Sequence, residues 1–120
     1  MNAGYRFIEV EQHGDVALVK LKQRRLTESE IAMLGDELLR VGQEGCPRVV
    51  LSLAPSPEYL FSVFLAKLIA LQRQLTELGG GLKLMGCDAL LLDVFETCQI
   101  KERFEFYPDA ESALQSWRQG

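Results

Sequence analysis

A short apolar run near the middle of the 120-residue chain places the strongest constraint on its fold. Residues Val49 to Leu53 are all apolar except Ser52. A nearly continuous apolar run of this length is typical of a central strand that is covered on both faces. Pro55 and Pro57 follow directly, and proline has no N–H group to donate to a strand ladder, so the strand should end there. The run therefore predicts a sheet that carries helices on its faces.

Apolar patterns on either side of this run predict the other strands. Residues 5–11 and 16–22 are expected to form a hairpin, joined by a turn that contains His13. Further strands are predicted over residues 82–87 and 103–107. The sheet should therefore contain about five strands.

The first predicted helix begins with a capping signature. Thr27 and Glu30 have the spacing of a capping box, in which each side chain bonds to the backbone N–H of the other residue. Apolar residues then recur on one face as far as Val41. Glycine favours positions just beyond a helix, so Gly42 and Gly45 are expected to end it.

Three further helices are expected. The second runs over about residues 60–78 and closes at the glycine triplet 79–81, which is not a phosphate loop because no Gly-Lys-Ser/Thr follows. Asp88 is predicted to cap a short third helix, and Asp109 a last one. The order β-β-α-β-α-β-α-β-α predicts a single α/β domain over residues 1–120, with a mixed, mostly parallel sheet and four helices.

Charge and hydropathy argue against several classes of partner. The net charge of −4 and the sequence pI near 5.0 are unlike those of a nucleic-acid-binding domain, which usually has a basic face. No apolar run approaches the length of a membrane span, so we expect no direct membrane insertion. The first residues lack the features of a signal peptide, and the chain is expected to be cytoplasmic.

The reactive side chains do not assemble into a catalytic or metal-binding pattern. Cys46, Cys87 and Cys98 are an odd number with no close pair, so they are interpreted as buried or half-buried thiols. The one histidine, His13, lies in a predicted turn and is interpreted as a solvated side chain. No nucleophile, base and orienting group come together, so the sequence predicts neither an enzyme nor a cofactor or metal site.

The order of elements and several stretches resemble the STAS domain, the family of anti-sigma-factor antagonists and sulfate-transporter C-terminal domains. The resemblance covers nearly the whole chain. Val49 to Leu53, followed by residues 59–65, is similar to a family strand that leads into an Asp-Ser-Ser/Thr-Gly-Leu turn. Residues 94–100 resemble the end of the third family helix, and residues 104–114 its last strand and helix. The resemblance implies a STAS-like α/β fold.

The resemblance also implies a candidate phosphorylation site at Ser62. In phosphorylatable members the serine after the Asp receives the phosphate, and that position is Ser62 here. Phe61 replaces the acid, Val63 the second hydroxyl and Phe64 the glycine. A second register would place the acceptor at Val63, which cannot be phosphorylated. Ser62 is expected near a helix start, where free N–H groups favour a phosphate, although serine is also an ordinary residue at that place.

An apolar ridge follows this serine. Phe61, Leu65 and Ile69 are spaced four residues apart, beside the core stripe of the second helix. With Tyr59 and Ser62 they form a candidate interaction surface. The alternative is that the ridge belongs to an unusually wide core stripe.

The resemblance implies a non-catalytic, regulatory protein–protein interaction module. Such a module would act in bacterial transcription control, in a partner-switching system or a signalling scaffold. Its partner would be an anti-sigma-type kinase or another STAS protein, and it could also form a homodimer. Two alternatives stay open: an accessory STAS subunit of a transporter complex, and a small-ligand-binding domain that holds its ligand at the strand ends.

Overall fold

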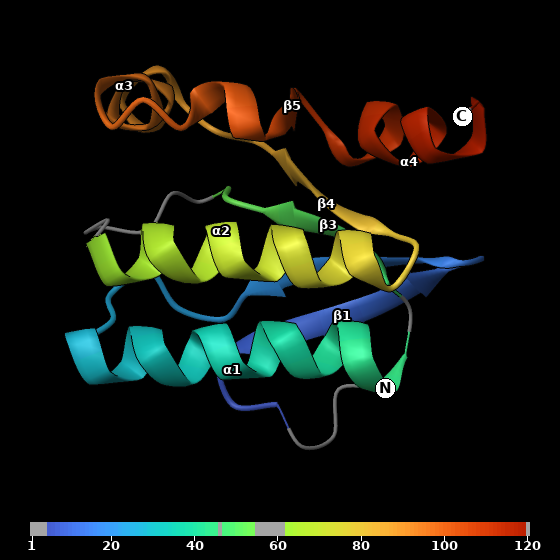
Figure 1. Ribbon diagram of the computed structural model, residues 1–120, viewed down its shortest axis with the longest axis horizontal. Helices are drawn as coiled ribbons and strands as arrows, with labels where there is room; N and C mark the ends of the chain where they lie inside the picture. The colour runs from blue at the N-terminus through green and yellow to red at the C-terminus, as the bar shows by residue number, and fades with distance from the viewer. Residues whose placement is uncertain (1–4, 46, 55–61, 120) are drawn as a thin grey trace.

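The computed structural model describes residues 5–45, 47–54 and 62–119 (Figure 1). Within these ranges five strands form one sheet in the order β1-β2-β3-β4-β5. The strands are β1 (Ile8–His13), β2 (Val16–Leu21), β3 (Arg48–Ser52), β4 (Gly81–Met85) and β5 (Glu105–Tyr107). β1 and β2 pair antiparallel, whereas the other three pairings are parallel. The predicted mixed, mostly parallel sheet is confirmed.

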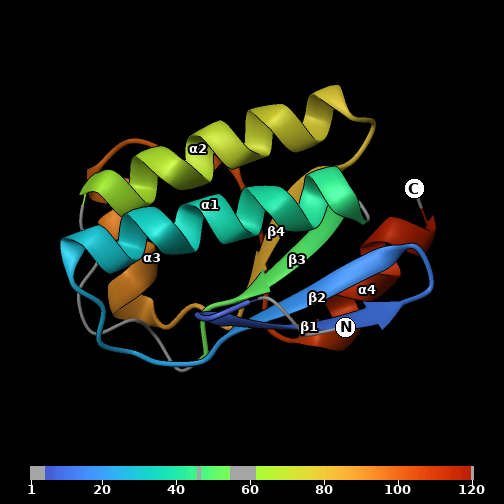
Figure 2. The same ribbon diagram turned by 90° about the horizontal axis from the view of Figure 1, so that it is seen from below.

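Four α-helices and one short 3-10 helix connect and cover the strands in the described ranges. They are α1 (Glu28–Glu44), α2 (Ser62–Glu77), α3 (Ala89–Thr97), the 3-10 helix η1 (Lys101–Arg103) and α4 (Ala110–Gln119). The predicted order β-β-α-β-α-β-α-β-α is confirmed. Figure 2 shows α1 and α2 on one side of the sheet and α4 on the other.

The central strand is buried on both faces, as its apolar composition predicts. Val49 and Leu51 of β3 belong to the larger core cluster, which α1, α2 and α3 complete. Val50 points the other way, into a smaller cluster with Ala113 and Leu114 of α4. All three β3 valine and leucine side chains are fully buried. Two faces covered by helices explain why this strand lacks the alternation of a half-exposed strand.

The capping box of α1 is confirmed, but the predicted helix end at Gly42 is wrong. The Thr27 hydroxyl accepts the backbone N–H of Glu30 at 3.2 Å, and the Glu30 carboxylate accepts that of Thr27 at 2.9 Å. The helix continues through Gly42 and ends at Gly45. Gly42 is buried, and a Cβ atom there would overlap the Leu75 side chain of α2. This glycine therefore serves the close packing of two helices, not the end of one.

The predicted end of α2 and the predicted starts of α3 and α4 agree with the structure. α2 spans Ser62–Glu77, while residues 60 and 61 of the predicted helix lie outside the described ranges. An Asp88 carboxylate oxygen accepts the Leu91 N–H at 2.8 Å and caps α3. Asp109 accepts the Ser112 N–H at 2.8 Å in the same way at α4.

The last strand is shorter than predicted. Arg103 belongs to η1, because its N–H donates to the Ile100 carbonyl at 3.0 Å and closes a tight turn. Gln72 of α2 fixes this turn: its amide nitrogen donates to the Arg103 carbonyl at 3.1 Å, and its amide oxygen accepts the Leu82 N–H at 2.7 Å. The strand β5 can begin only beyond this anchor, at Glu105.

The cysteines and the hairpin show smaller differences. Cys87 is half-buried as predicted, whereas Cys98 is exposed, because it follows the end of α3 and faces away from the core. Cys46 lies outside the described ranges. His13 ends β1, and its Nε2 lies 3.0 Å from a carboxylate oxygen of Glu11.

No helix of the described ranges is long and apolar enough to cross a membrane.

Candidate functional site

The sequence-predicted site lies at one end of the molecule. Because β3 and β4 are parallel, their carboxyl ends lie at the same edge of the sheet, followed by the first turns of α2 and α3. Both ribbon views place the start of α2 and the helix α3 at the same end of the molecule (Figures 1 and 2). Ser62 is the first residue of α2 in the described ranges, and residues 55–61 before it lie outside them. The position of Ser62 at the helix start stays a prediction.

The first turn of α2 differs from that of its neighbour α1. It contains no acidic residue, whereas the first turn of α1 contains Glu28 and Glu30. Negative groups near a helix N-terminus interact favourably with the helix dipole and with the free N–H groups. Within the described residues, the start of α2 therefore lacks the acidic side chains that α1 has, and a phosphate on Ser62 would supply that charge.

The backbone beneath this end is held by hydrogen bonds between neighbouring strands. The Leu53 N–H donates to the Met85 carbonyl at 2.9 Å, just beyond the end of β3. The Gly86 N–H donates to the Tyr107 carbonyl at 3.1 Å. These bonds continue the strand ladder past the ends of β3 and β4. They hold the backbone in place at Leu53 and Gly86.

The candidate interaction surface is placed only in part. Leu65 is 7% exposed and belongs to the core, and Ile69 is half-buried against it. The structure thus favours the core interpretation for these two side chains. Tyr59 and Phe61 lie outside the described ranges. The interaction surface remains a prediction that now centres on Ser62 and its neighbours.

Sequence reasoning missed an exposed apolar side chain at the same end. Leu90, in the first turn of α3, is 75% exposed. The helix places Leu91 and Phe95 toward the core, which leaves Leu90 outside. Three consecutive leucines on one helix cannot all face the core, so the sequence could have predicted that one of them is exposed. Which of the three is exposed depends on where the helix begins.

The thiol of Cys87, just before α3, is half-buried. Burial raises its pKa to about 11, and the negative charge of Asp88 adds to the effect. Only the thiolate reacts with iodoacetamide. In a C46S/C98S variant we therefore expect Cys87 to be alkylated at pH 8 about 100-fold more slowly than a free thiol. The rate, measured by intact-mass spectrometry, should still rise between pH 9 and 10. A rate that levels off between pH 9 and 10 in the folded protein would contradict this expectation, whereas the rate in the denatured protein should approach its plateau over that range.

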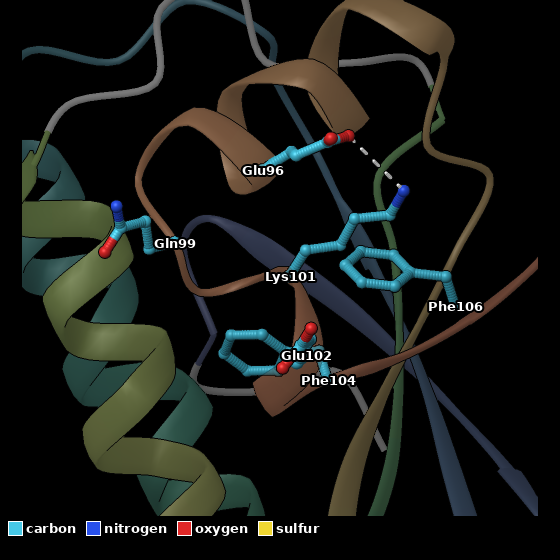
Figure 3. Close-up of a pocket in the computed structure, with 6 residues that line it drawn as sticks. All are labelled: Glu96, Gln99, Lys101, Glu102, Phe104 and Phe106. Atoms are coloured by element: carbon cyan, nitrogen blue, oxygen red, sulfur yellow. Dashed lines mark ion pairs between the residues drawn. The ribbon is translucent and has the colours of Figure 1, made fainter.

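A cavity of about 870 Å³ lies beside α3, η1 and β5. Its lining consists of Glu96, Gln99, Lys101, Glu102, Phe104 and Phe106 (Figure 3). Phe104 and Phe106 pack edge-on against Phe95, with ring centroids 5.7 and 5.3 Å away. Lys101 and Glu96 form an ion pair of 3.7 Å across the cavity. Aromatic rings and a charged rim suit a small amphipathic molecule.

No group of His, Cys, Asp and Glu side chains in the described part of the chain could hold a metal ion. What the Ser62 end offers is a helix N-terminus and an exposed leucine. Both are features of a binding surface.

Solved structures share this fold. A STAS-domain anti-sigma-factor antagonist protein from Planctomyces limnophilus matches with a TM-score of 0.79 and 22% sequence identity, over 91% of this chain and 96% of that chain. An anti-sigma factor antagonist from Mycobacterium paratuberculosis matches with a TM-score of 0.77 and 23% identity, over 92% of both chains.

The anti-sigma factor antagonist SpoIIAA matches in two forms. The unphosphorylated form has a TM-score of 0.75 and 12% identity, over 94% of this chain and 97% of that chain. The phosphorylated form, from Bacillus, has a TM-score of 0.67 and 12% identity, over 91% and 97%. The murine anion transporter Slc26a9 matches with a TM-score of 0.68 and 12% identity, over 92% of this chain but 19% of the transporter.

No family model matches the sequence, and no curated protein does. The structural matches have identities below 25%, so they establish the fold. Element order, sheet topology and coverage agree with the resemblance found in the sequence. The chain has the fold of the STAS domains of anti-sigma-factor antagonists.

Proposed function

We propose that the chain is a single-domain, non-catalytic regulatory module that docks a partner protein through the end of the molecule that contains Ser62. The observation that carries this proposal is the position of Ser62 at the start of the described part of α2, whose first turn has no acidic residue. The shared fold with anti-sigma-factor antagonists supports it. The partner is an anti-sigma-type kinase or another STAS protein, in the bacterial cytoplasm.

Leu90 is the apolar anchor of this docking surface. It is 75% exposed and lies in the first turn of α3, which follows β4 at the same edge of the sheet. A leucine that protrudes at a binding end gains about 1.5 to 3 kcal/mol when a partner buries it fully. In the sequence, Phe61 replaces the family acid next to Ser62 and also favours apolar contact. Phe64, in place of the family glycine, is 2% exposed and belongs to the core.

Phosphorylation of Ser62 is the regulatory step of the proposal. SpoIIAA, which shares the fold, exists in a phosphorylated form. A phosphate at the start of α2 would favour the helix by about 0.3 to 1 kcal/mol. The same phosphate would repel acidic groups of a partner and hinder apolar contact. The proposed result is release of the partner when Ser62 is phosphorylated.

The test is capture of a tagged chain from native cells, followed by mass spectrometry of its partners and of Ser62. We expect one protein partner to be enriched with the wild type and with Ser62→Ala. Ser62→Glu and Leu90→Asp should each reduce its recovery about tenfold or more, because each places a charge on the docking surface. Gln74→Glu is the matched control: it adds the same charge to an exposed position further along α2. Equal recovery with all variants would rule out this surface.

A second candidate function rests on the cavity beside α3. Its phenylalanine floor and charged rim favour a small-ligand-binding domain. The transporter match favours a related possibility, an accessory subunit of a transporter complex. Co-purification with an ATPase or transporter subunit, instead of a kinase or STAS protein, would support the accessory subunit.

Thermal-shift screening tests the small-ligand-binding domain. A ligand that stabilises the wild type, and whose effect Phe106→Ala abolishes, would support that function.

A further inference from the structure

A buried lysine lies at the end of the molecule opposite Ser62. Lys83 of β4 points to the sheet face that α4 covers, and its side chain is 9% exposed. Within the described ranges it is the one charged residue that belongs to the buried class. A buried ammonium is costly unless neighbouring groups compensate its charge. Its surroundings therefore need an explanation.

The groups around Lys83 use only part of its hydrogen-bonding capacity. Its Nζ donates to the Ser116 hydroxyl at 2.7 Å and lies 4.1 Å from the centroid of the Trp117 ring. The nearest Glu105 oxygen is 3.6 Å away, beyond hydrogen-bond distance, and already accepts the Tyr107 hydroxyl at 2.6 Å. An ammonium has three N–H donors. Among the described residues, Ser116 is its one hydrogen-bond acceptor.

A second cation lies against the same indole. The guanidinium carbon of Arg48 is 5.5 Å from the Trp117 ring centroid. One Arg48 nitrogen donates to Asp15 at 2.9 Å, which leaves further donors of the five in a guanidinium. Trp117 itself has a buried Nε1 that finds no acceptor in the described part of the chain. Two cations and an unpaired donor therefore meet around one side chain.

These groups line a cavity of about 320 Å³, which we call the basic cavity after Arg48, Lys83, Ser116 and Trp117. It lies where β3 and β4 begin and α4 ends, and both ribbon views place the end of α4 far from the start of α2. Gln72 also lines it, but both ends of its amide group are engaged by backbone partners. Glu105 is the acidic group in the lining, and its side chain is 62% exposed.

We propose that the basic cavity binds a small oxyanion, such as phosphate, sulfate or the carboxylate of a small metabolite. The oxyanion would accept from Lys83 and Arg48, which lie on adjacent strands and share the Trp117 ring. Glu105 is exposed enough to turn toward solvent and leave the ammonium to the ligand. Charge-assisted hydrogen bonds from two cations in a partly closed cavity are the usual basis of such recognition.

The only tryptophan of the chain reports directly on this cavity. Its indole N–H gives one resolvable signal in a proton–nitrogen correlation spectrum. We expect titration with sodium phosphate at constant ionic strength to move this signal saturably, and sodium sulfate and acetate to do the same with other affinities. Sodium chloride at matched ionic strength should not produce a saturable shift.

Lys83→Met tests the assignment, because methionine keeps the length and apolar contacts of the side chain. It should weaken phosphate binding about tenfold or more, since a charge-assisted hydrogen bond is lost. Arg48→Gln should also weaken phosphate binding. If circular dichroism shows that Lys83→Met does not fold, Arg48→Gln still tests the proposal. Lys20→Met, at an exposed lysine of β2, makes the same change in net charge and should leave binding intact. Unchanged affinity in a folded Lys83→Met or Arg48→Gln variant, or a response no different from chloride, would overturn the proposal.

Discussion

Replacing Phe95 with alanine should lower the free energy of unfolding by about 3 to 5 kcal/mol. Phe95 of α3 is fully buried, and its ring is the centre of an aromatic group. Phe104 and Phe106 both pack edge-on against it, at centroid distances of 5.7 and 5.3 Å. Alanine would leave a cavity and remove two favourable ring pairs. Chemical denaturation followed by circular dichroism would measure the loss.

Leu90→Ala is the matched control on the same helix. Leu90 is 75% exposed, so its truncation should change the free energy of unfolding by less than about 0.5 kcal/mol. Phe95→Leu should fall between the two, because it keeps part of the buried volume. A similar loss for Leu90→Ala and Phe95→Ala would mean that α3 does not pack as the structure shows.

Gly80→Ala is expected to destabilise the domain by about 3 kcal/mol. A Cβ atom at Gly80 would overlap the carbonyl carbon and oxygen of Pro47, and it would lie 2.8 Å from the Pro47 Cβ. That carbonyl also accepts the Gly81 N–H at 3.0 Å, so it cannot move without loss of a hydrogen bond where β3 and β4 begin. The shift in the denaturant midpoint would measure the effect.

Gly35→Ala provides the comparison for Gly80. A Cβ atom at Gly35 of α1 would also be crowded, but by Lys67 carbons at 2.7 to 3.0 Å. Lys67 is a flexible, half-buried side chain that can rotate, and alanine favours a helix interior by about 1 kcal/mol over glycine. We expect a change within about 1 kcal/mol of zero. If Gly35→Ala cost as much as Gly80→Ala, rigid backbone contact would not be the cause.

The sheet could be predicted because its signals are local. The apolar run of β3, the capping box at Thr27 and the caps at Asp88 and Asp109 each involve residues within a few positions of one another. The role of Gly42 could not be predicted, because it depends on Leu75 of a different helix. A glycine near an expected helix end has the same local pattern whether it caps or packs.

The burial of Lys83 is a second feature that local sequence patterns could not predict. Lys83 alternates with Leu82 and Leu84, a pattern that usually indicates a half-exposed strand with the lysine in solvent. The structure buries it, because α4 returns over that face from about thirty residues later in the chain. Only the tertiary fold brings Ser116 and Trp117 to this lysine.

For the candidate site, the prediction that Ser62 lies at a helix start followed from the prolines and the apolar periodicity. The outward direction of Leu90 did not, because it depends on α3 starting at Ala89. The ridge of Leu65 and Ile69 was ambiguous for a similar reason. A wide apolar stripe looks the same whether a third helix covers it or not, and here the core reaches both residues.

The strand order of the sheet has a consequence for synthesis on the ribosome. Each strand pairs with the one that precedes it in the chain, so the growing sheet can be extended at one edge as residues leave the exit tunnel. The sheet face that carries Val16, Leu18 and Val50 packs against α4. It stays open to water and to chaperones until α4, the last helix, has been made. The nascent domain is therefore most prone to aggregate after β3 has left the exit tunnel and before α4 has done so.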